Sequence, residues 1–119
     1  HKATEQADTT SKDCDYATLA RVYGQMATLF DKQYLPYQEL AAYEKGSKYA
    51  LQAGDTLNAI KFYQNRMGTF AILGKIDSAI MINLTAAKMF RHIGRNYESA
   101  LAFGCNYSFY LQHIVKLRQ

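Results

Sequence analysis

Three glycines, Gly54, Gly74 and Gly94, lie 20 residues apart, and this spacing constrains the fold of the chain more than any other feature. A polar residue follows each glycine, which is typical of a helix that ends in a left-handed C-terminal cap. Twenty residues before Gly54 the same spacing reaches Tyr34, and Pro36 follows shortly after it. Proline is tolerated in the first turn of a helix but not in its middle, so this position is also predicted to be a boundary between helices.

The segments between these boundaries carry helical periodicity. Ile60, Tyr63, Met67 and Phe70 recur at spacings of 3, 4 and 3, which places them on one apolar stripe. One proline and seven glycines among 119 residues also favour helix over a turn-rich β architecture. The sequence therefore predicts an all-α fold of about five helices, at residues 13–33, 36–53, 56–73, 76–93 and 96–113, after a disordered or frayed segment at 1–12.

Polar residues at the predicted helix starts agree with these boundaries. Asp55 or Thr56 is expected to cap the third helix, and Asn96 the fifth. Asp77 would place a carboxylate in the first turn of the fourth helix, where it interacts favourably with the helix dipole.

Similar residues return at twice the glycine spacing. Tyr23, Tyr63 and Phe103 stand 40 residues apart, so alternate helices are equivalent and the repeating unit is a helix pair. We expect the aromatic residues at the stripe positions to form the core of each pair; they are Tyr23, Phe30, Tyr63, Phe70, Phe103 and Tyr110. The predicted repeat domain covers residues 13–119, divided into 13–53, 54–93 and a partial unit at 94–119.

The stretch from Tyr63 to Ile80 resembles a tetratricopeptide repeat (TPR). Phe70 follows Tyr63 by seven residues, Gly74 comes four later and Ala79 five after that. The period of about 40 residues is similar to a long variant found in bacterial regulatory and signalling proteins. The resemblance implies a right-handed superhelical array of antiparallel helix pairs, a TPR-like α-solenoid, whose concave groove binds a peptide or protein.

In this family the first helix of each pair lines the groove. With Tyr23, Tyr63 and Phe103 as the register, the resemblance implies that ten residues face the groove, namely Arg21, Gln25, Thr28, Lys61, Gln64, Asn65, Gly68, Leu101, Cys105 and Ser108. Only Asn65 matches the clamp of Lys, Asn and Arg side chains with which some members hold a terminal carboxylate.

Gly24, Gly68 and Gly104 stand in the interiors of the first helices, and two interpretations of them remain open. Small residues let a bound peptide backbone approach closely, and neighbouring amide side chains could pair with it. Alternatively, these glycines relieve crowding between packed helices within the domain itself.

The sequence offers no sign of an enzyme, a cofactor or a metal site. It contains no phosphate-binding loop, dinucleotide fingerprint or zinc-protease motif. Cys14 and Cys105 have no metal-type spacing, and we interpret both as free, partly buried thiols. His92 is expected in the last turn of its helix, where a cation complements the dipole. The sequons at Asn83 and Asn106 fall inside predicted helices and are not expected to carry glycans.

Charge leaves two further functions open. Residues 1–44 carry four Lys/Arg against seven Asp/Glu, whereas residues 45–119 carry ten against three. A basic all-α half could bind nucleic acid, although no predicted helix clusters Arg, Lys, Asn and Gln as a recognition helix does. The fifth helix lacks a pairing partner, so it could mediate self-association, or the native protein could continue beyond it.

The leading hypothesis is a protein-interaction module, the sensory or scaffold part of a longer bacterial regulatory or cell-envelope protein. Such a protein could be periplasmic, envelope-associated or cytoplasmic. The longest nearly uncharged apolar stretch, Ala79 to Ala87, is far below the roughly 20 residues of a membrane-spanning helix.

Overall fold

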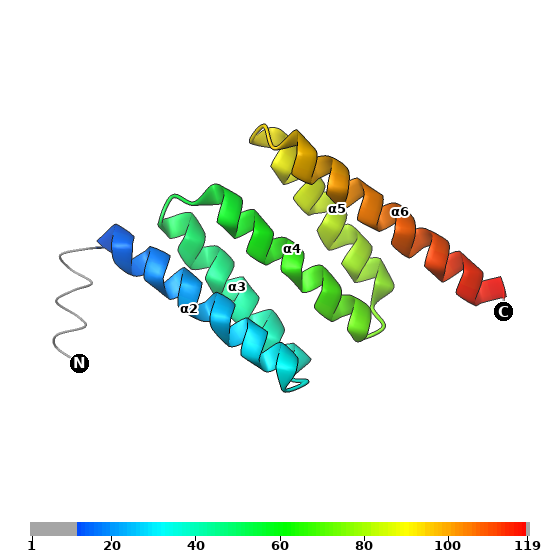
Figure 1. The fold of residues 1–119 in the computed structure, drawn as a ribbon, viewed down its shortest axis with the longest axis horizontal. Helices are drawn as coiled ribbons and strands as arrows, with labels where there is room; N and C mark the ends of the chain where they lie inside the picture. The colour runs from blue at the N-terminus through cyan, green and yellow to red at the C-terminus, as the bar shows by residue number, and fades with distance from the viewer. Residues whose placement is uncertain (1–11, 119) are drawn as a thin grey trace. The chain divides into compact units, whose positions relative to one another are not determined.

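The computed structural model describes the backbone of residues 12–118, and the side chains of residues 15–106 and of Lys116. The described part of the chain is all-α (Figure 1). Its helices are α2 (Lys12–Lys32), α3 (Pro36–Gln52), α4 (Thr56–Ile72), α5 (Ile76–His92) and α6 (Asn96–Arg118). Each helix packs against its neighbours along the chain, as in a helical repeat array.

The predicted glycine caps explain why the helices end where they do. Gly54, Gly74 and Gly94 have φ angles of 80°, 79° and 81°, in the left-handed region that glycine adopts without a steric penalty. Tyr34 takes the same role with a φ angle of 58°. At each turn a backbone N–H reaches back to the preceding helix, as from Asp55 to the Ala50 carbonyl at 2.9 Å. The first four predicted helices are confirmed to within one residue at each end, and α6 extends five residues beyond its predicted end.

The helix starts agree only in part with the sequence prediction. Asp55 caps α4, since its Oδ1 accepts a hydrogen bond from the Asn58 backbone N–H at 3.1 Å. Asp77 lies in the first turn of α5, as predicted. The prediction for Asn96 is wrong, because Asn96 is already helical and Arg95 precedes it. Arg95 instead forms an ion pair with Glu98 at 2.7 Å in the first turn of α6.

The described helices belong to two compact units, which we call unit 1 (His1–Phe62) and unit 2 (Tyr63–Gln119). The core of unit 1 contains Ala20, Ala50, Ala59 and Phe62, with Tyr43 and Tyr49 packed against it. Unit 2 buries Phe90 of α5 and several alanines of α5 and α6, namely Ala79, Ala86, Ala87 and Ala102. Alanines at these places allow two helices to approach closely.

The aromatic stripe is less buried than the sequence predicts. Tyr23, Phe30, Tyr63 and Phe70 are only partly buried. Phe103 is 42% exposed, so its assignment to the core is wrong. The buried phenylalanines are instead Phe62 and Phe90, and the side chain of Tyr110 lies outside the described residues.

Candidate functional site

The predicted groove residues on α2 share one face of the helix. Arg21, Gln25 and Thr28 follow one another at spacings of four and three, and all three side chains are exposed. The Thr28 hydroxyl donates to the Gly24 carbonyl at 3.2 Å, within the helix itself. Arg21 and Gln25 therefore present the polar groups of this face to solvent.

Helix α4 contributes predicted residues to both units. Lys61 is exposed in unit 1, and Asn65 and Gly68 are exposed in unit 2. Gln64 differs from them because it is half-buried and its Nε2 donates to Asn83 Oδ1 at 2.9 Å. The Gln64 amide nitrogen thus makes a contact within unit 2.

On α6 the predicted residues lie on an exposed face. Leu101 is 52% exposed, and Cys105 is an exposed free thiol, not the partly buried one that the sequence suggests. The side chains of Ser108 and Cys14 lie outside the described residues.

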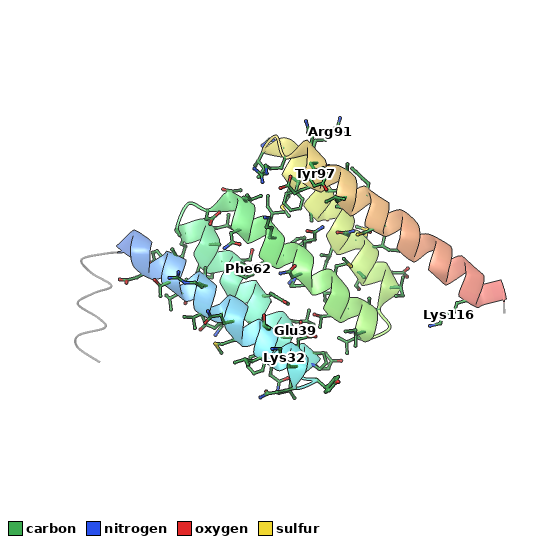
Figure 2. The ribbon with its side chains drawn as sticks, in the orientation of Figure 1. Lys32, Glu39, Phe62, Arg91, Tyr97 and Lys116 are labelled. Atoms are coloured by element: carbon green, nitrogen blue, oxygen red, sulfur yellow. The ribbon has the colours of Figure 1, made fainter. Side chains whose placement is uncertain are left out.

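The glycines of the first helices divide between the two interpretations that the sequence leaves open. A Cβ at Gly24 would lie 2.8 Å from Phe62 Cε1, and one at Gly46 of α3 would lie 3.3 Å from Phe62 Cδ2. The Phe62 ring (Figure 2) therefore fits against two helices that both lack a side chain where it approaches. In contrast, a Cβ at Gly68 or Gly104 would meet no atom within 4 Å. Gly24 serves packing, whereas no contact in the described structure requires glycine at the other two positions.

Unit 1 contains a cluster of aromatic rings between α2 and α3. Tyr49 stacks on Tyr16 at 6.0 Å and on Tyr23 at 5.7 Å between ring centroids, and Lys45 Nζ lies 5.6 Å from the Tyr23 ring. Stacked rings and a nearby cation stabilise the contact between the two helices. This cluster was not predicted from the sequence, although Tyr16 precedes Tyr23 by seven residues, the spacing of two helical turns.

Tyr43 lies in the same unit, with its ring centroid 6.3 Å from that of Phe62. Burial raises the pKa of Tyr43 above its ordinary value, and the carboxylates of Glu39 and Asp31 raise it further. Both causes favour the neutral phenol. Tyr43 is therefore an uncharged core residue in unit 1 at neutral pH.

Unit 2 instead contains a chain of amide hydrogen bonds centred on Asn83, which is fully buried. Asn83 Oδ1 accepts from Gln64 of α4, and Asn83 Nδ2 donates to the Ala102 carbonyl of α6 at 2.8 Å. A separate hydrogen bond joins the same two helices, in which Asn106 Nδ2 of α6 donates to the Ile80 carbonyl of α5 at 3.2 Å. Each asparagine sits in a sequon, and the amide nitrogen that a glycan would occupy is the one that donates. The sequence signal for these hydrogen bonds was Asn83, a polar residue inside an otherwise mostly apolar stretch.

The described side chains contain no group of three or more His, Cys, Asp and Glu residues that could hold a metal ion. Among the helices of residues 12–118, none is long and apolar enough to cross a bilayer. His92 lies in the last turn of α5 beside Arg91, as the sequence predicts.

Comparison of the chain with protein-family models, with curated proteins and with solved structures finds no match.

Proposed function

We propose that this chain is a TPR-like repeat module that binds a peptide or protein partner through its first helices, α2, α4 and α6. In this proposal it is the sensory or scaffold part of a longer bacterial regulatory or cell-envelope protein. The regular 20-residue spacing of helix ends supports the repeat assignment, since α2, α4 and α6 begin a new helix pair about every 40 residues.

The exposure of the predicted binding residues carries the proposal. Eight of the ten predicted residues are exposed in the described structure, namely Arg21, Gln25, Thr28, Lys61, Asn65, Gly68, Leu101 and Cys105. A glycine in a helix interior costs about 1 kcal/mol relative to alanine. At Gly68 no contact in the described structure compensates for this cost, and the open space beside it would admit the backbone of a partner.

The first test removes polar groups from the proposed binding faces. The triple variant Arg21→Ala, Lys61→Ala and Asn65→Ala changes three exposed side chains, for which no hydrogen bond is seen in the described structure. It should fold normally and lose partner capture, because two charges and one amide would no longer pair with the partner. Capture from cell lysate after photo-crosslinking, quantified by mass spectrometry, measures the loss.

A matched control variant changes the second helices of the pairs. Lys48→Ala, Gln52→Ala and Lys88→Ala also remove two cations and one amide, all exposed, from α3 and α5. Partners that the control retains and the first triple variant loses would support the proposal. Equal retention by both variants would show that the assignment of the binding faces is wrong.

The charge of unit 2 favours nucleic acid as a second candidate ligand. Residues 63–119 carry seven Lys/Arg against two Asp/Glu, a net charge of +5. Binding to phosphates would weaken steeply with salt, because counterions are released on binding. A fluorescence titration with a labelled 20-mer in about 50 and 200 mM salt tests this candidate, and no binding at the lower concentration would eliminate it.

A further inference from the structure

The turn between α5 and α6 differs in charge from the other turns of the array. Over the same positions of each turn, three turns contain one cation and one carboxylate and are therefore neutral, namely residues 28–38, 48–58 and 68–78. Residues 88–98, which we call the basic turn, contain Lys88, Arg91 and Arg95 against Glu98. With His92 neutral, the basic turn has a net charge of +2. The positive charge of unit 2 is therefore gathered in part at one turn.

The cations of the basic turn stand on both helices, and the turn brings them together. The Arg95 backbone N–H donates to the Phe90 carbonyl at 2.8 Å, so the start of α6 lies against the last turn of α5, which contains Arg91. Lys88 precedes Arg91 by three residues and shares its face of α5. The side chains of Lys88, Arg91 and Arg95 are all exposed. An anion at this turn would therefore meet several cations at once.

Arg95 is held in place by Glu98 and keeps donors in reserve. Its Nε and Nη2 donate to Glu98 Oε2 at 3.1 and 2.7 Å. The Arg95 side chain is nevertheless 46% exposed, and within the described residues no hydrogen bond from its Nη1 is seen. Because a guanidinium has more N–H donors than Glu98 uses, Arg95 can also donate to an oxygen of a bound anion.

The helix dipoles account for only part of this charge. Arg91 and His92 lie in the last turn of α5, where a cation is favourable. Arg95 directly precedes α6, where a cation is unfavourable, and at the equivalent position Asp55 caps α4. Lys75 precedes α5 in the same way, but it is the only Lys or Arg among residues 68–78. The dipoles therefore explain the cations of α5 but not the one that precedes α6.

An exposed aromatic ring lies beside these cations. Tyr97, in the first turn of α6, is 73% exposed, whereas Leu57 at the equivalent position of α4 is partly buried. Figure 2 shows Arg91 and Tyr97 at the same turn of unit 2. Among the described side chains, no ring stacks on Tyr97. The Tyr97 ring can therefore receive a flat group of a ligand.

Cations beside an open aromatic ring match a strand in which phosphates alternate with bases. Phosphates pair with Lys and Arg, and an unpaired base stacks on an aromatic side chain. An acidic protein segment would use the cations and leave the ring without a role. An anionic membrane would need more apolar side chains to enter it, and Ile93 is the only exposed aliphatic residue of the basic turn. A single-stranded nucleic acid uses both features.

We propose that the basic turn binds single-stranded nucleic acid, with phosphates at Lys88, Arg91 and Arg95 and one base stacked on Tyr97. The inference rests on the second candidate function, nucleic-acid binding by unit 2, and assigns it a site and a form of nucleic acid. It does not depend on the proposed protein-binding faces of α2, α4 and α6.

Fluorescence anisotropy with a labelled single strand of about 20 nucleotides tests the proposal. Contacts with three phosphates should weaken binding about 20-fold between about 50 and 200 mM salt, because each contributes about −0.7 to the slope of log K against log salt. An abasic strand of the same length should bind at least fivefold more weakly, since it cannot stack. Equal binding of both strands, or no binding at the lower salt concentration, would overturn the proposal. Equally tight binding of polyglutamate or of phosphatidylglycerol vesicles would do the same.

Charge variants locate the site. Arg95→Asn removes a cation but supplies a side chain that can cap α6, so the melting temperature should stay the same or rise while binding weakens. Arg91→Gln and Arg95→Asn should each reduce the salt slope by about 0.7. Lys75→Gln is the matched control, because it removes an exposed cation of unit 2 from a neutral turn. If Lys75→Gln weakened binding as much as Arg91→Gln, the overall charge of unit 2 would hold the strand, and the proposal would be wrong.

A variant of the ring separates stacking from charge. Tyr97→Leu introduces the residue found at the equivalent position of α4. It should weaken binding of the single strand at least fivefold, leave the salt slope unchanged and leave binding of the abasic strand unaffected. Equal weakening for the two strands would contradict a stacked base.

The result can be judged separately from the other proposals. The triple variant of Arg21, Lys61 and Asn65 should still bind the strand, and Arg91→Gln should still capture protein partners. Strand binding that Arg91→Gln, Arg95→Asn and Tyr97→Leu all leave unchanged would overturn the assignment of the basic turn. Nucleic acid would then remain a candidate ligand for another surface of unit 2.

Discussion

The helices of unit 1 meet around an aromatic ring, whereas those of unit 2 meet around side-chain amides. In unit 1, Phe62 of α4 packs on Gly24 of α2, Gly46 of α3 and the ring of Tyr43. Forty residues later, the positions of Gly24, Tyr43 and Phe62 are taken by a different set, Gln64, Asn83 and Ala102. There, Asn83 bridges the Gln64 side chain and the Ala102 carbonyl.

The same three positions thus fill one junction in two ways. In unit 1 the large side chain, Phe62, is on the later helix α4, and the earlier helix α2 has a glycine, Gly24, where the ring approaches. Unit 2 places a small residue on the later helix, and two amides fill the space that remains. The side-chain volume is thus distributed differently among the three positions in the two units. The helices are packed at equivalent positions, but by different kinds of side chain.

A hydroxyl contact shows the same exchange on a smaller scale. In unit 1 the Ser47 hydroxyl of α3 donates to the Ala59 carbonyl of α4 at 2.8 Å. In unit 2 the Ser99 hydroxyl of α6 donates to the Ala87 carbonyl of α5 at 2.9 Å. Ser47 and Ala87 occupy equivalent positions, and so do Ala59 and Ser99. The donor and acceptor helices have changed places, and the hydrogen bond between the helices is retained.

The largest predicted effect comes from removing the aromatic ring of unit 1. Phe62→Ala should lower the free energy of unfolding by about 3 to 5 kcal/mol, because the ring is buried and the two glycines cannot close the cavity. Urea denaturation followed by circular dichroism measures the loss. Phe103→Ala is the matched control, and it should cost less than 1 kcal/mol or so, since the ring is 42% exposed. Equal losses of unfolding free energy in the two variants would show that the Phe62 ring stabilises the protein no more than an exposed phenylalanine does.

The next effect concerns the amides of unit 2. Asn83→Leu should cost about 1 to 3 kcal/mol, because it leaves the half-buried Gln64 amide without its acceptor. The double variant Gln64→Leu and Asn83→Leu should recover part of this loss, since replacing both partners by apolar groups removes the unpaired amide. The two unfolding curves measure the coupling. If the double variant lost more unfolding free energy than the two single variants lose together, the amide interpretation would be contradicted.

Glycine substitutions should have opposite signs in the two units. Gly24→Ala should destabilise the protein by about 1 to 2 kcal/mol, because the new methyl group overlaps the Phe62 ring. Gly104→Ala, at the equivalent position 80 residues later, should stabilise it by about 0.5 to 1 kcal/mol, because the methyl group meets open space. Thermal unfolding of both variants gives the signs. Stabilisation by Gly24→Ala would mean that the ring moves aside without cost.

Much of the fold could be predicted from the sequence because helix ends carry local signals. Glycine can adopt a positive φ whatever packs around it, and a residue with positive φ ends a helix. Gly54, Gly74 and Gly94 therefore mark the ends of three helices directly. The N-cap prediction for Asn96 was wrong by one residue, because α6 already begins at Asn96. The ion pair between Arg95 and Glu98 lies in that first turn.

The interior of the junctions could not be predicted in this way. The 40-residue match of Tyr23, Tyr63 and Phe103 suggested one shared core, yet their burial depends on which helix covers each of them. Phe62, one residue before the matched position, is the ring that is buried. The exposure of most of the predicted groove residues followed from the helical register. The contact between Gln64 and Asn83 instead depends on the packing of two helices and has no local signal.

The smallest predicted effect uses the one junction residue that titrates. Tyr43 of unit 1 has a raised pKa in the folded protein, mainly through burial, whereas Asn83 at the equivalent position of unit 2 carries no proton that titrates. Below the unfolded pKa of about 10 both states hold the phenol proton, and Tyr43 causes no pH dependence of stability. As the pH rises through that value, the unfolded state loses the proton first. Stability should therefore fall on the alkaline side.

Tyr43→Phe should remove this contribution, because phenylalanine fills the same space beside Phe62 without an ionisable group. The melting temperature of the unchanged protein should fall more between about pH 9 and pH 11 than that of the variant. Tyr97→Phe, at an exposed tyrosine of unit 2, serves as the control and should leave the fall unchanged. If Tyr43→Phe and Tyr97→Phe gave the same alkaline slope, the phenol of Tyr43 would be as well solvated as a surface tyrosine. The junction of unit 1 would then be open to water, and Phe62 alone would make it apolar.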